Sequence, residues 1–180
     1  MKSLVIVDLQ KDFYDPSGSL YVSGAEALPA RVAAKATDFD CVFLTLDWHP
    51  ANHCSFVANG GTWPAHCLQY SWGASLPDEV LSVLDRDRQD VFFYEKGTHA
   101  YREEYAAFND ISETELKALK ASDQIVVCGL CGDYCVGQTI KCLAELGLTD
   151  RIAVDLSCTG SIDDGSALKA IIDELNLQTL

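Results

Sequence analysis

Leu4-Val5-Ile6-Val7-Asp8, near the start of the chain, is a row of four aliphatic residues closed by an acid. A short apolar run of this kind is typical of a strand that is buried on both faces of a parallel sheet. Four similar runs follow, and segments with a helical spacing of apolar residues separate them. The predicted strands are 3–9, 41–46, 91–95, 124–129 and 151–156, and the predicted helices are 25–37, 79–84, 113–120, 134–146 and 165–175.

The alternation of strands and helices indicates the fold class. It predicts an α/β fold, a three-layer α/β/α sandwich with a mostly parallel, doubly wound sheet of about five or six strands. Two helix ends carry local signals, because Ser112 and Glu115 form a capping box and Gly147 is suited to ending a helix. The stretch 47–77 breaks the alternation, since it is rich in Gly, Pro, Asn, His and Trp and too long for an ordinary connection. We therefore expect one domain over 1–180 with a functional loop at about 47–77.

Composition narrows the class of partner. A chain of 180 residues, 48% hydrophobic and 22% charged, can bury the core of one domain. Its formal net charge of -14 would repel phosphate backbones and anionic membranes, so we expect a small neutral substrate and neither nucleic acid nor a membrane as partner. Because no apolar run is long enough to cross a bilayer and no signal peptide is recognisable, we expect a cytoplasmic protein whose eight cysteines are mostly reduced packing thiols.

Polar side chains follow four of the predicted strands at the points where those strands end. Asp8 closes the first strand, Asp47 follows the second, Lys96 follows the third, and Cys135 lies in the turn or first helical turn after the fourth. Ligands of open parallel sheets bind beyond the carboxyl ends of the strands. We therefore expect these four side chains to converge on one site.

Three of the four side chains suggest nucleophilic catalysis. At the start of a helix, the sulfur of Cys135 would meet free N–H groups and the positive end of the helix dipole, which favours a thiolate nucleophile. Asp8 could accept the thiol proton, and Lys96 could pair with Asp8 and stabilise the thiolate. The structural alternatives are an inert core thiol, an acid that caps a turn, and an ordinary solvated lysine.

The long loop contains a group of metal-ligand types. Asp47, His49 and His66 offer one carboxylate and two imidazoles, a set that leaves coordination positions open for water or substrate. The alternative is that all three are polar loop residues, although three of the four histidines in the chain fall in this one segment. His53 could be a fourth ligand or a hydrogen-bonding neighbour of the ligands, and its spacing leaves both open.

A second metal reading comes from the spacing of Cys128, Cys131 and Cys135, which could indicate a thiolate or iron–sulfur site. Cys128 lies inside an apolar strand pattern, so we expect its side chain in the core. No fourth cysteine is placed to complete a tetrahedral site.

Taken together, these motifs resemble the nicotinamidases, within the cysteine hydrolase superfamily that also includes isochorismatase and carbamoylsarcosine amidases. The resemblance covers nearly the whole chain. It rests on the following segments: Val5-Ile6-Val7-Asp8-Leu9-Gln10-Lys11-Asp12-Phe13, Leu46-Asp47-Trp48-His49-Pro50 with Asn52-His53, Trp63-Pro64-Ala65-His66-Cys67-Leu68-Gln69, Glu95-Lys96-Gly97, and Gly129-Leu130-Cys131-Gly132-Asp133-Tyr134-Cys135-Val136.

The resemblance implies an activity and its parts. The expected reaction is hydrolysis of nicotinamide to nicotinate and ammonia through a cysteine thioester, with Asp8, Lys96 and Cys135 as catalytic residues. A divalent metal, zinc or alternatively iron or manganese, would be held by Asp47, His49 and His66 and would orient the pyridine ring. An assembly of several copies of the chain is compatible with the resemblance.

The resemblance also implies the walls of the pocket. Phe13, Trp63 and Tyr105 would line a slot for a flat ring. A cis peptide would fall at Leu130–Cys131, and the amides of Cys131 and Cys135 would form the oxyanion hole. The chain departs from the family pattern in carrying Cys131 and Gly132 in place of a small residue and a threonine, and in carrying Trp72 in the segment 70–76.

Two other functions remain open from the sequence. A different amidase or an isochorismatase-like ether hydrolase would share Asp8, Lys96 and Cys135 but would not need the metal segment. A metal- or redox-responsive binding module would instead use the thiols and histidines, and an iron–sulfur chromophore would distinguish it.

Overall fold

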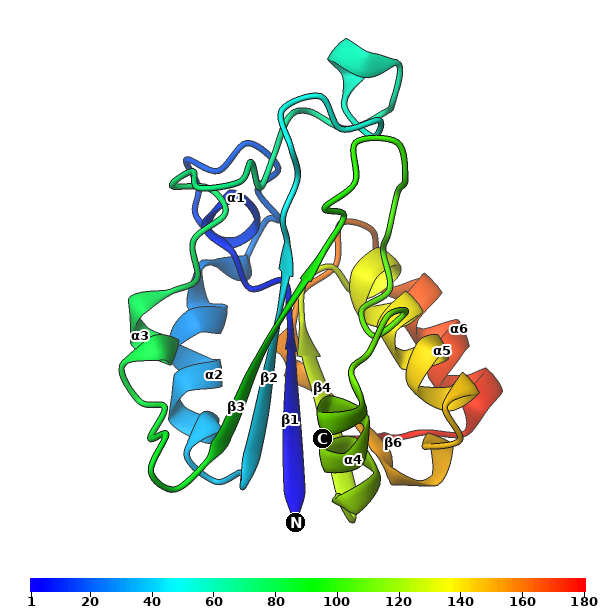
Figure 1. Cartoon of the computed structure of the whole chain (residues 1–180). Helices are drawn as coiled ribbons and strands as arrows, with labels where there is room; N and C mark the ends of the chain where they lie inside the picture. Colours follow the sequence, from blue (N-terminus) through cyan, green and yellow to red (C-terminus); the bar gives the residue numbers. More distant parts are fainter.

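Six parallel strands form one sheet in the computed structural model, which describes residues 1–180. The spatial order is β3-β2-β1-β4-β5-β6, so the chain winds outward from β1 in one direction and then in the other (Figure 1). The strands are β1 (Lys2–Val7), β2 (Cys41–Asp47), β3 (Asp90–Lys96), β4 (Gln124–Gly129), β5 (Ile152–Thr159) and β6 (Gln178–Thr179). The winding reverses between β1 and β4, and a crevice forms beyond the carboxyl ends of strands at such a point.

Helices cover both faces of the sheet. Three of them, α1 (Lys11–Tyr14), α2 (Leu28–Ala36) and α3 (Asp78–Leu81), lie on one face, and α4 (Glu113–Ala121), α5 (Gly137–Glu145) and α6 (Ser166–Leu175) lie on the other (Figure 1). The remaining short helices are η1 (Ala25–Ala27), η2 (Val57–Asn59), η3 (Gly132–Val136) and η4 (Thr149–Arg151). The expected three-layer α/β/α architecture is therefore confirmed.

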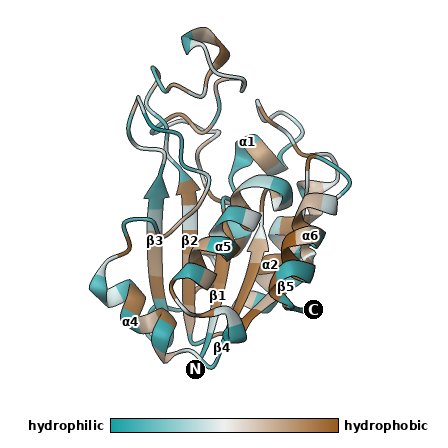
Figure 2. Cartoon of the chain, turned by 90° about the vertical axis from the view of Figure 1, so that its right-hand side faces the viewer, coloured by the Kyte–Doolittle hydropathy of each residue, from teal (hydrophilic) through white to brown (hydrophobic).

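Alternate residues of the central strands point to opposite faces and supply two hydrophobic cores. On β1, Leu4 and Ile6 join a cluster of 22 buried residues, and Val5 and Val7 join a cluster of 19. The first cluster is closed by α2 and the second by α4, α5 and α6. Figure 2 shows the apolar strands in the interior and the polar faces of the helices outside. The continuous apolar run in β1 is thus explained by burial on both faces.

Some element boundaries differ from the sequence prediction. The strand predicted at 91–95 was expected to be buried, but β3 is the edge of the sheet and Phe93 is 43% exposed. The helix predicted at 79–84 ends at Leu81, and β6, which has two residues, has no alternating pattern to reveal it. The capping box of Ser112 and Glu115 is present, and Gly147 follows the end of α5 with φ 79°.

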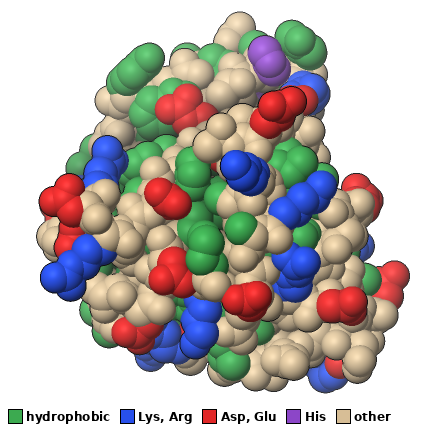
Figure 3. Space-filling model, turned by 60° about the horizontal axis from the view of Figure 1, so that its bottom comes forward, with side chains coloured by type: hydrophobic (Ala, Val, Ile, Leu, Met, Phe, Trp, Pro, Cys, Tyr) green, Lys and Arg blue, Asp and Glu red, His purple; other side chains and the backbone are tan.

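Acidic and basic side chains are interspersed on the surface where the strands begin, as Figure 3 shows. The net negative charge is therefore not gathered into one patch on that face. None of the helices is both long enough and apolar enough to cross a membrane. The long loop between β2 and α3 lies at the opposite end of the sheet, beyond the carboxyl ends of the strands (Figure 1).

Candidate active site

The four polar side chains that follow the strands meet at one point. Lys96, the last residue of β3, places its Nζ 2.8 Å from Asp8 Oδ2 and 3.4 Å from Cys135 Sγ, and it also donates to Asp47 Oδ1. All four side chains are buried, with Lys96 2% exposed and Asp8 fully enclosed. The structure therefore brings together the four side chains that were expected to meet because each follows the end of a strand.

Asp8 is held in an uncommon backbone conformation, with φ 45°. Its N–H donates to the carbonyl and hydroxyl oxygens of Thr45 on β2, and the Thr45 hydroxyl donates to Asp8 Oδ1 at 2.6 Å. These contacts fix one carboxylate oxygen, and Lys96 pairs with the other. Burial raises the pKa of Asp8, although the charge of Lys96 opposes the shift. A carboxylate with a raised pKa is a better proton acceptor.

Lys96 remains a cation in this setting. Burial alone would lower its pKa, but the carboxylates of Asp47 and Asp8 raise it well above the usual range. For Asp47 the balance is similar, because burial disfavours its charge while Lys96, His49 and His66 hold its pKa well below the ordinary value. The centre thus contains a fixed positive charge between two carboxylates.

Cys135 is in the five-residue π-helix η3 and is 5% exposed. Burial raises the pKa of its thiol well above the usual range, and Lys96 opposes this shift without reversing it. In this structure burial therefore outweighs the influences that favour a thiolate. Removal of the thiol proton requires a base, and the nearest oxygen of Asp8 is within 4.8 Å of the sulfur.

Asp47, His49 and His66 place their ligand atoms within 4.8 Å of one another. Asp47 Oδ2 is 3.6 Å from His49 Nε2 and 3.7 Å from His66 Nε2. Four ligands around zinc lie about 3.4 Å from one another, so these separations suit a shared metal ion. His49 Nδ1 donates to the Gly97 carbonyl and His66 Nδ1 donates to the Pro64 carbonyl, at 2.9 and 2.8 Å. In the neutral form of each ring this leaves Nε2, which faces Asp47, as the acceptor, and that form binds a metal.

Gly97 is required beside His49. Its φ is 63°, and a Cβ at this position would lie 2.3 Å from His49 Cε1. A side chain there would displace the imidazole from the group. Gly97, which directly follows Lys96 in the chain, thus helps to position His49.

His53 does not join the metal-ligand group formed by Asp47, His49 and His66. Its Nε2 donates to the Arg102 carbonyl at 3.0 Å, its Nδ1 is 2.7 Å from Ser55 Oγ, and its ring stacks on His49. A second set of metal-ligand types, His49, His53 and Glu103, also lies within 4.8 Å. Because both nitrogens of His53 have protein partners, its place here is that of a neighbour supporting His49.

The pocket beside Cys135 is narrow and largely apolar. It is lined by Phe13, Leu20, Asp47, Trp63, His66, Glu103, Tyr105, Cys131, Tyr134, Cys135 and Ile162. Trp63 Nε1 donates to Tyr105 Oη at 3.0 Å, and the Phe13 ring is 5.5 Å from that of His66. The side chains leave a cavity of 20 Å³, about the room of one water molecule, so a flat ring enters only as they move apart.

Two features of the nucleophile loop, the segment 129–135 that ends at Cys135, follow the expected pattern. The Leu130–Cys131 peptide is cis, and the Cys131 N–H makes no hydrogen bond within the protein. That N–H is thus available to a ligand. Cys128 instead lies in the larger hydrophobic core, and none of the groups of metal-ligand residues contains more than one cysteine. The thiolate or iron–sulfur reading of the cysteine spacing therefore has no support.

Comparison with known proteins agrees with this geometry. The sequence pattern of the isochorismatase domain matches residues 2–178. The chain belongs to the isochorismatase family. It is 34% identical to a nicotinamidase/pyrazinamidase of Mycobacterium tuberculosis, over 91% of this chain and 89% of that protein.

The fold of this isochorismatase-family chain is also similar to that of solved structures. PnC1 from L. infantum, crystallised in complex with nicotinate, superposes with a TM-score of 0.84 at 32% identity, over 100% of this chain and 92% of that one. The pyrazinamidase of Pyrococcus horikoshii, in complex with zinc, has a TM-score of 0.81 at 24% identity, over 99% and 98% of the two chains. The second likeness shows the shared fold.

Several contacts in the isochorismatase-family site were not expected from the sequence. Thr45 binds Asp8, and Glu104 accepts from the Gly97 N–H while its carbonyl accepts from Lys96. The pocket-lining residues not expected are Leu20, Glu103, Tyr134 and Ile162. Only Thr45 had a usable signal, a hydroxyl inside an apolar strand. The others lie in loops whose path no local pattern determines.

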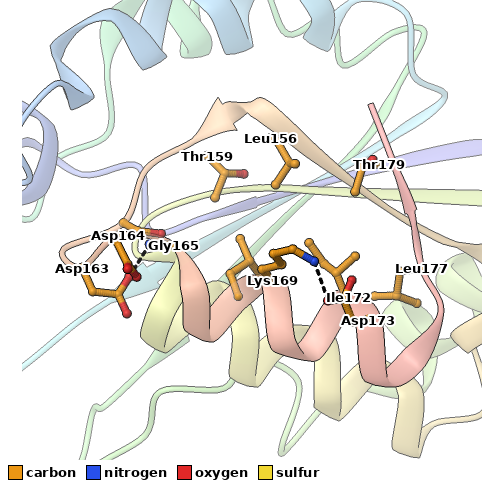
Figure 4. A pocket seen from close by; sticks show the side chains of 12 residues that line it. Leu156, Thr159, Asp163, Asp164, Gly165, Lys169, Ile172, Asp173, Leu177 and Thr179 are labelled. Carbon is orange, nitrogen blue, oxygen red and sulfur yellow. Dashed lines mark hydrogen bonds and ion pairs between the residues drawn. The ribbon is translucent and has the colours of Figure 1, made fainter.

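A large cavity of the isochorismatase domain lies elsewhere, between the end of β5, β6 and α6, and measures 690 Å³ (Figure 4). Its charged side chains are satisfied locally, since Lys169 pairs with Asp173 and Asp163 accepts from the Gly165 N–H. It has no buried nucleophile or group of metal ligands. The smaller pocket beside Cys135 is therefore the candidate active site.

Proposed function

We propose that this chain is a nicotinamidase that hydrolyses nicotinamide to nicotinate and ammonia. The observation that carries the proposal is the position of Lys96 Nζ, which contacts Asp8, Asp47 and Cys135 at once, directly beside the two histidines. A nucleophile, a base and a metal-ligand set thus share one narrow pocket. The likeness to a nicotinamidase/pyrazinamidase and to a protein crystallised with nicotinate supports the same activity.

The first chemical step forms a thioester. Asp8 removes the proton of the Cys135 thiol, the sulfur attacks the carboxamide carbon, and Lys96 stabilises the negative charge as it develops on the sulfur. The carbonyl oxygen becomes an oxyanion that accepts hydrogen bonds from the N–H groups of Cys131 and Cys135. Asp8 then gives its proton to the departing nitrogen, which leaves as ammonia.

The second step hydrolyses the thioester. Asp8, again a carboxylate, takes a proton from water, and the resulting hydroxide attacks the thioester carbon. The carbon–sulfur bond breaks and nicotinate leaves, while Cys135 regains its proton. Phe13, Trp63 and Tyr105 hold the flat ring during both steps.

Asp47, His49 and His66 are proposed to hold one divalent metal, with zinc as the first choice and iron or manganese as alternatives. A metal bound there would supply a Lewis acid for the pyridine nitrogen and would so help to orient the ring. We further propose that residues 1–180 form one hydrolase domain in which the segment 47–77 is the metal-binding insertion.

Replacing Cys135 tests the function directly. The Cys135→Ala variant is expected to release no ammonia from nicotinamide while it retains its fold and its bound metal, because alanine leaves no nucleophile. The matched control is Cys142→Ala, which removes a half-buried thiol from α5 outside the pocket and should keep normal turnover. Ammonia release by Cys135→Ala at the wild-type rate would refute the assignment.

A further inference from the structure

The segment between β5 and α6, residues 160–165, forms part of the wall of the active-site pocket, although the reaction steps do not use it. Ile162 lines this pocket and is 47% exposed, whereas Phe13 and Cys135 in the same pocket are 3% and 5% exposed. Ile162 thus stands at the outer rim, with the nucleophile at the floor. The other side of the segment, with Asp163, Asp164 and Gly165, faces the large cavity at the start of α6 (Figure 4).

The segment is tied to the nucleophile loop by backbone hydrogen bonds. The Gly132 N–H donates to the Gly160 carbonyl at 2.8 Å, and the Gly160 N–H donates to the Gly129 carbonyl at 3.1 Å. Asp133, two residues before the nucleophile, accepts from the Ile162 N–H at 3.1 Å and from the Asp163 N–H at 2.9 Å, with one oxygen for each. The position of Ile162 is therefore set by the loop that carries Cys135.

The close approach depends on the missing side chain at Gly132. A Cβ there would lie 2.3 Å from Ser161 Oγ and 3.1 Å from Leu168 Cδ2. A larger residue would require the side chains of Ser161 and Leu168 to move. Gly132 and Asp133 thus act together, one by leaving space and the other by supplying two acceptors.

We propose that the segment 160–165 is the specificity wall of the active site, in which Ile162 is the specificity-determining residue and Asp133 its positioning residue. The inference rests on the proposed amide hydrolysis and deepens it by naming the substrate class. The wall admits single-ring aromatic carboxamides and rejects those with further ring substituents or a fused second ring.

The dimensions of the pocket explain this selectivity. The lining side chains already have to move apart to admit a single ring, and each added methyl group requires them to move further at the rim, where Ile162 stands. A contact of one methylene in an apolar pocket discriminates between substrates by about 10- to 200-fold. Shortening Ile162 removes part of that contact, and removing the Asp133 carboxylate allows the whole segment to move outward.

The test compares kcat and KM for nicotinamide with those for ring-methylated nicotinamides and quinoline-3-carboxamide. For Ile162→Ala we expect the ratio of kcat/KM for at least one larger amide to that for nicotinamide to rise by about 10-fold. Asp133→Ala should shift the ratio in the same direction, mainly through KM. Because both changes act on one contact, the double variant should shift the ratio no further than Ile162→Ala alone.

Two controls separate selectivity from general damage. Leu156→Ala truncates a 48% exposed side chain that lines the large cavity instead (Figure 4), and Asp164→Ala removes a carboxylate that accepts from the Ser166 N–H within the same stretch. Both should leave the ratio unchanged. A destabilised fold lowers kcat/KM for all substrates together and does not move the ratio.

The outcomes distinguish this inference from the function on which it rests. If the wild type hydrolyses nicotinamide but Ile162→Ala leaves the ratio unchanged, the specificity wall is wrong and the nicotinamidase activity stands. A wild type that does not hydrolyse nicotinamide overturns both. Because Ile162 is half exposed, its truncation keeps the fold, so the result decides the matter even if Asp133→Ala does not fold.

Discussion

Replacing Lys96 with methionine is expected to destabilise the protein strongly. Methionine keeps an unbranched side chain of similar length but removes the ammonium that contacts Asp8, Asp47 and Cys135. Asp8 and Asp47 are 0% and 5% exposed, so water cannot replace the lost partner. The variant therefore leaves two buried carboxylates without their cation.

The size of the effect follows from the cost of an unpaired buried charge. Removing one partner of a buried ion pair costs about 3–5 kcal/mol, a large share of the roughly 5–15 kcal/mol that stabilises a domain. The cost depends on pH, because burial already raises the pKa of Asp8 and the loss of Lys96 raises it further. A carboxyl group whose pKa is higher in the folded than in the unfolded protein destabilises the fold more and more as pH rises above the pKa of the unfolded chain. The loss of unfolding free energy in Lys96→Met should therefore be largest in alkaline solution and smaller in acid.

Urea unfolding of the metal-free protein, followed by tryptophan fluorescence, measures this penalty at about pH 5 and about pH 8. A matched control is Lys169→Met, which breaks an exposed pair with Asp173 on α6 and should change the unfolding free energy by less than about 0.5 kcal/mol. Adding Asp8→Asn to Lys96→Met should recover part of the loss, because it removes one unpaired charge. A Lys96→Met protein as stable as the wild type at about pH 8 would refute the reasoning.

Two further perturbations test the metal group and the ion pair beside β5. His49→Ala should lower the affinity for zinc by at least about 10-fold, as measured by metal content after dialysis. The control His99→Ala changes a histidine outside the group and should bind zinc like the wild type. Equal zinc binding by the two variants would contradict the ligand set. Asp155→Asn should lower the unfolding free energy by about 1 kcal/mol at neutral pH, since it removes the charge that Lys35 pairs with, although the exposure of Lys35 limits the effect. Burial would raise the pKa of Asp155, but Lys35 and Ser157 lower it overall. The stability that the ion pair adds is therefore complete above the ordinary carboxyl pKa of 3.8 and is lost as pH falls through the pKa of the folded protein. A stability difference between Asp155→Asn and the wild type that persists in strong acid would contradict the pairing.

The central strands and the residues that end them could be predicted because both follow from local rules. Burial on both faces requires an unbroken apolar run such as 4–7, and parallel strands bring their carboxyl ends to one edge. Asp8, Asp47 and Lys96 could therefore be placed together before any distance was known. The capping box at Ser112 is similarly local, since all its partners lie within one helical turn.

The order of the strands and the state of the nucleophile depend on contacts between distant segments. The exposure of β3 follows from its edge position, and β6 exists only because its two residues pair with β5. The pKa of the Cys135 thiol is raised because segments far apart in the chain bury it. His53 could not be assigned from spacing, since its partner is the carbonyl of Arg102 in another loop.

By itself, the sequence determined the α/β class, the residues at the strand ends and the three side chains of metal-ligand type, because residue type and local periodicity carry that information. Only the tertiary structure decided how these groups act on one another. The pKa of the sulfur, the oxygen of Asp8 that pairs with Lys96 and the position of Ile162 at the pocket depend on burial and on contacts between segments far apart in the chain. Such long-range contacts leave no periodic trace in the sequence, and so they become visible only when the chain is folded.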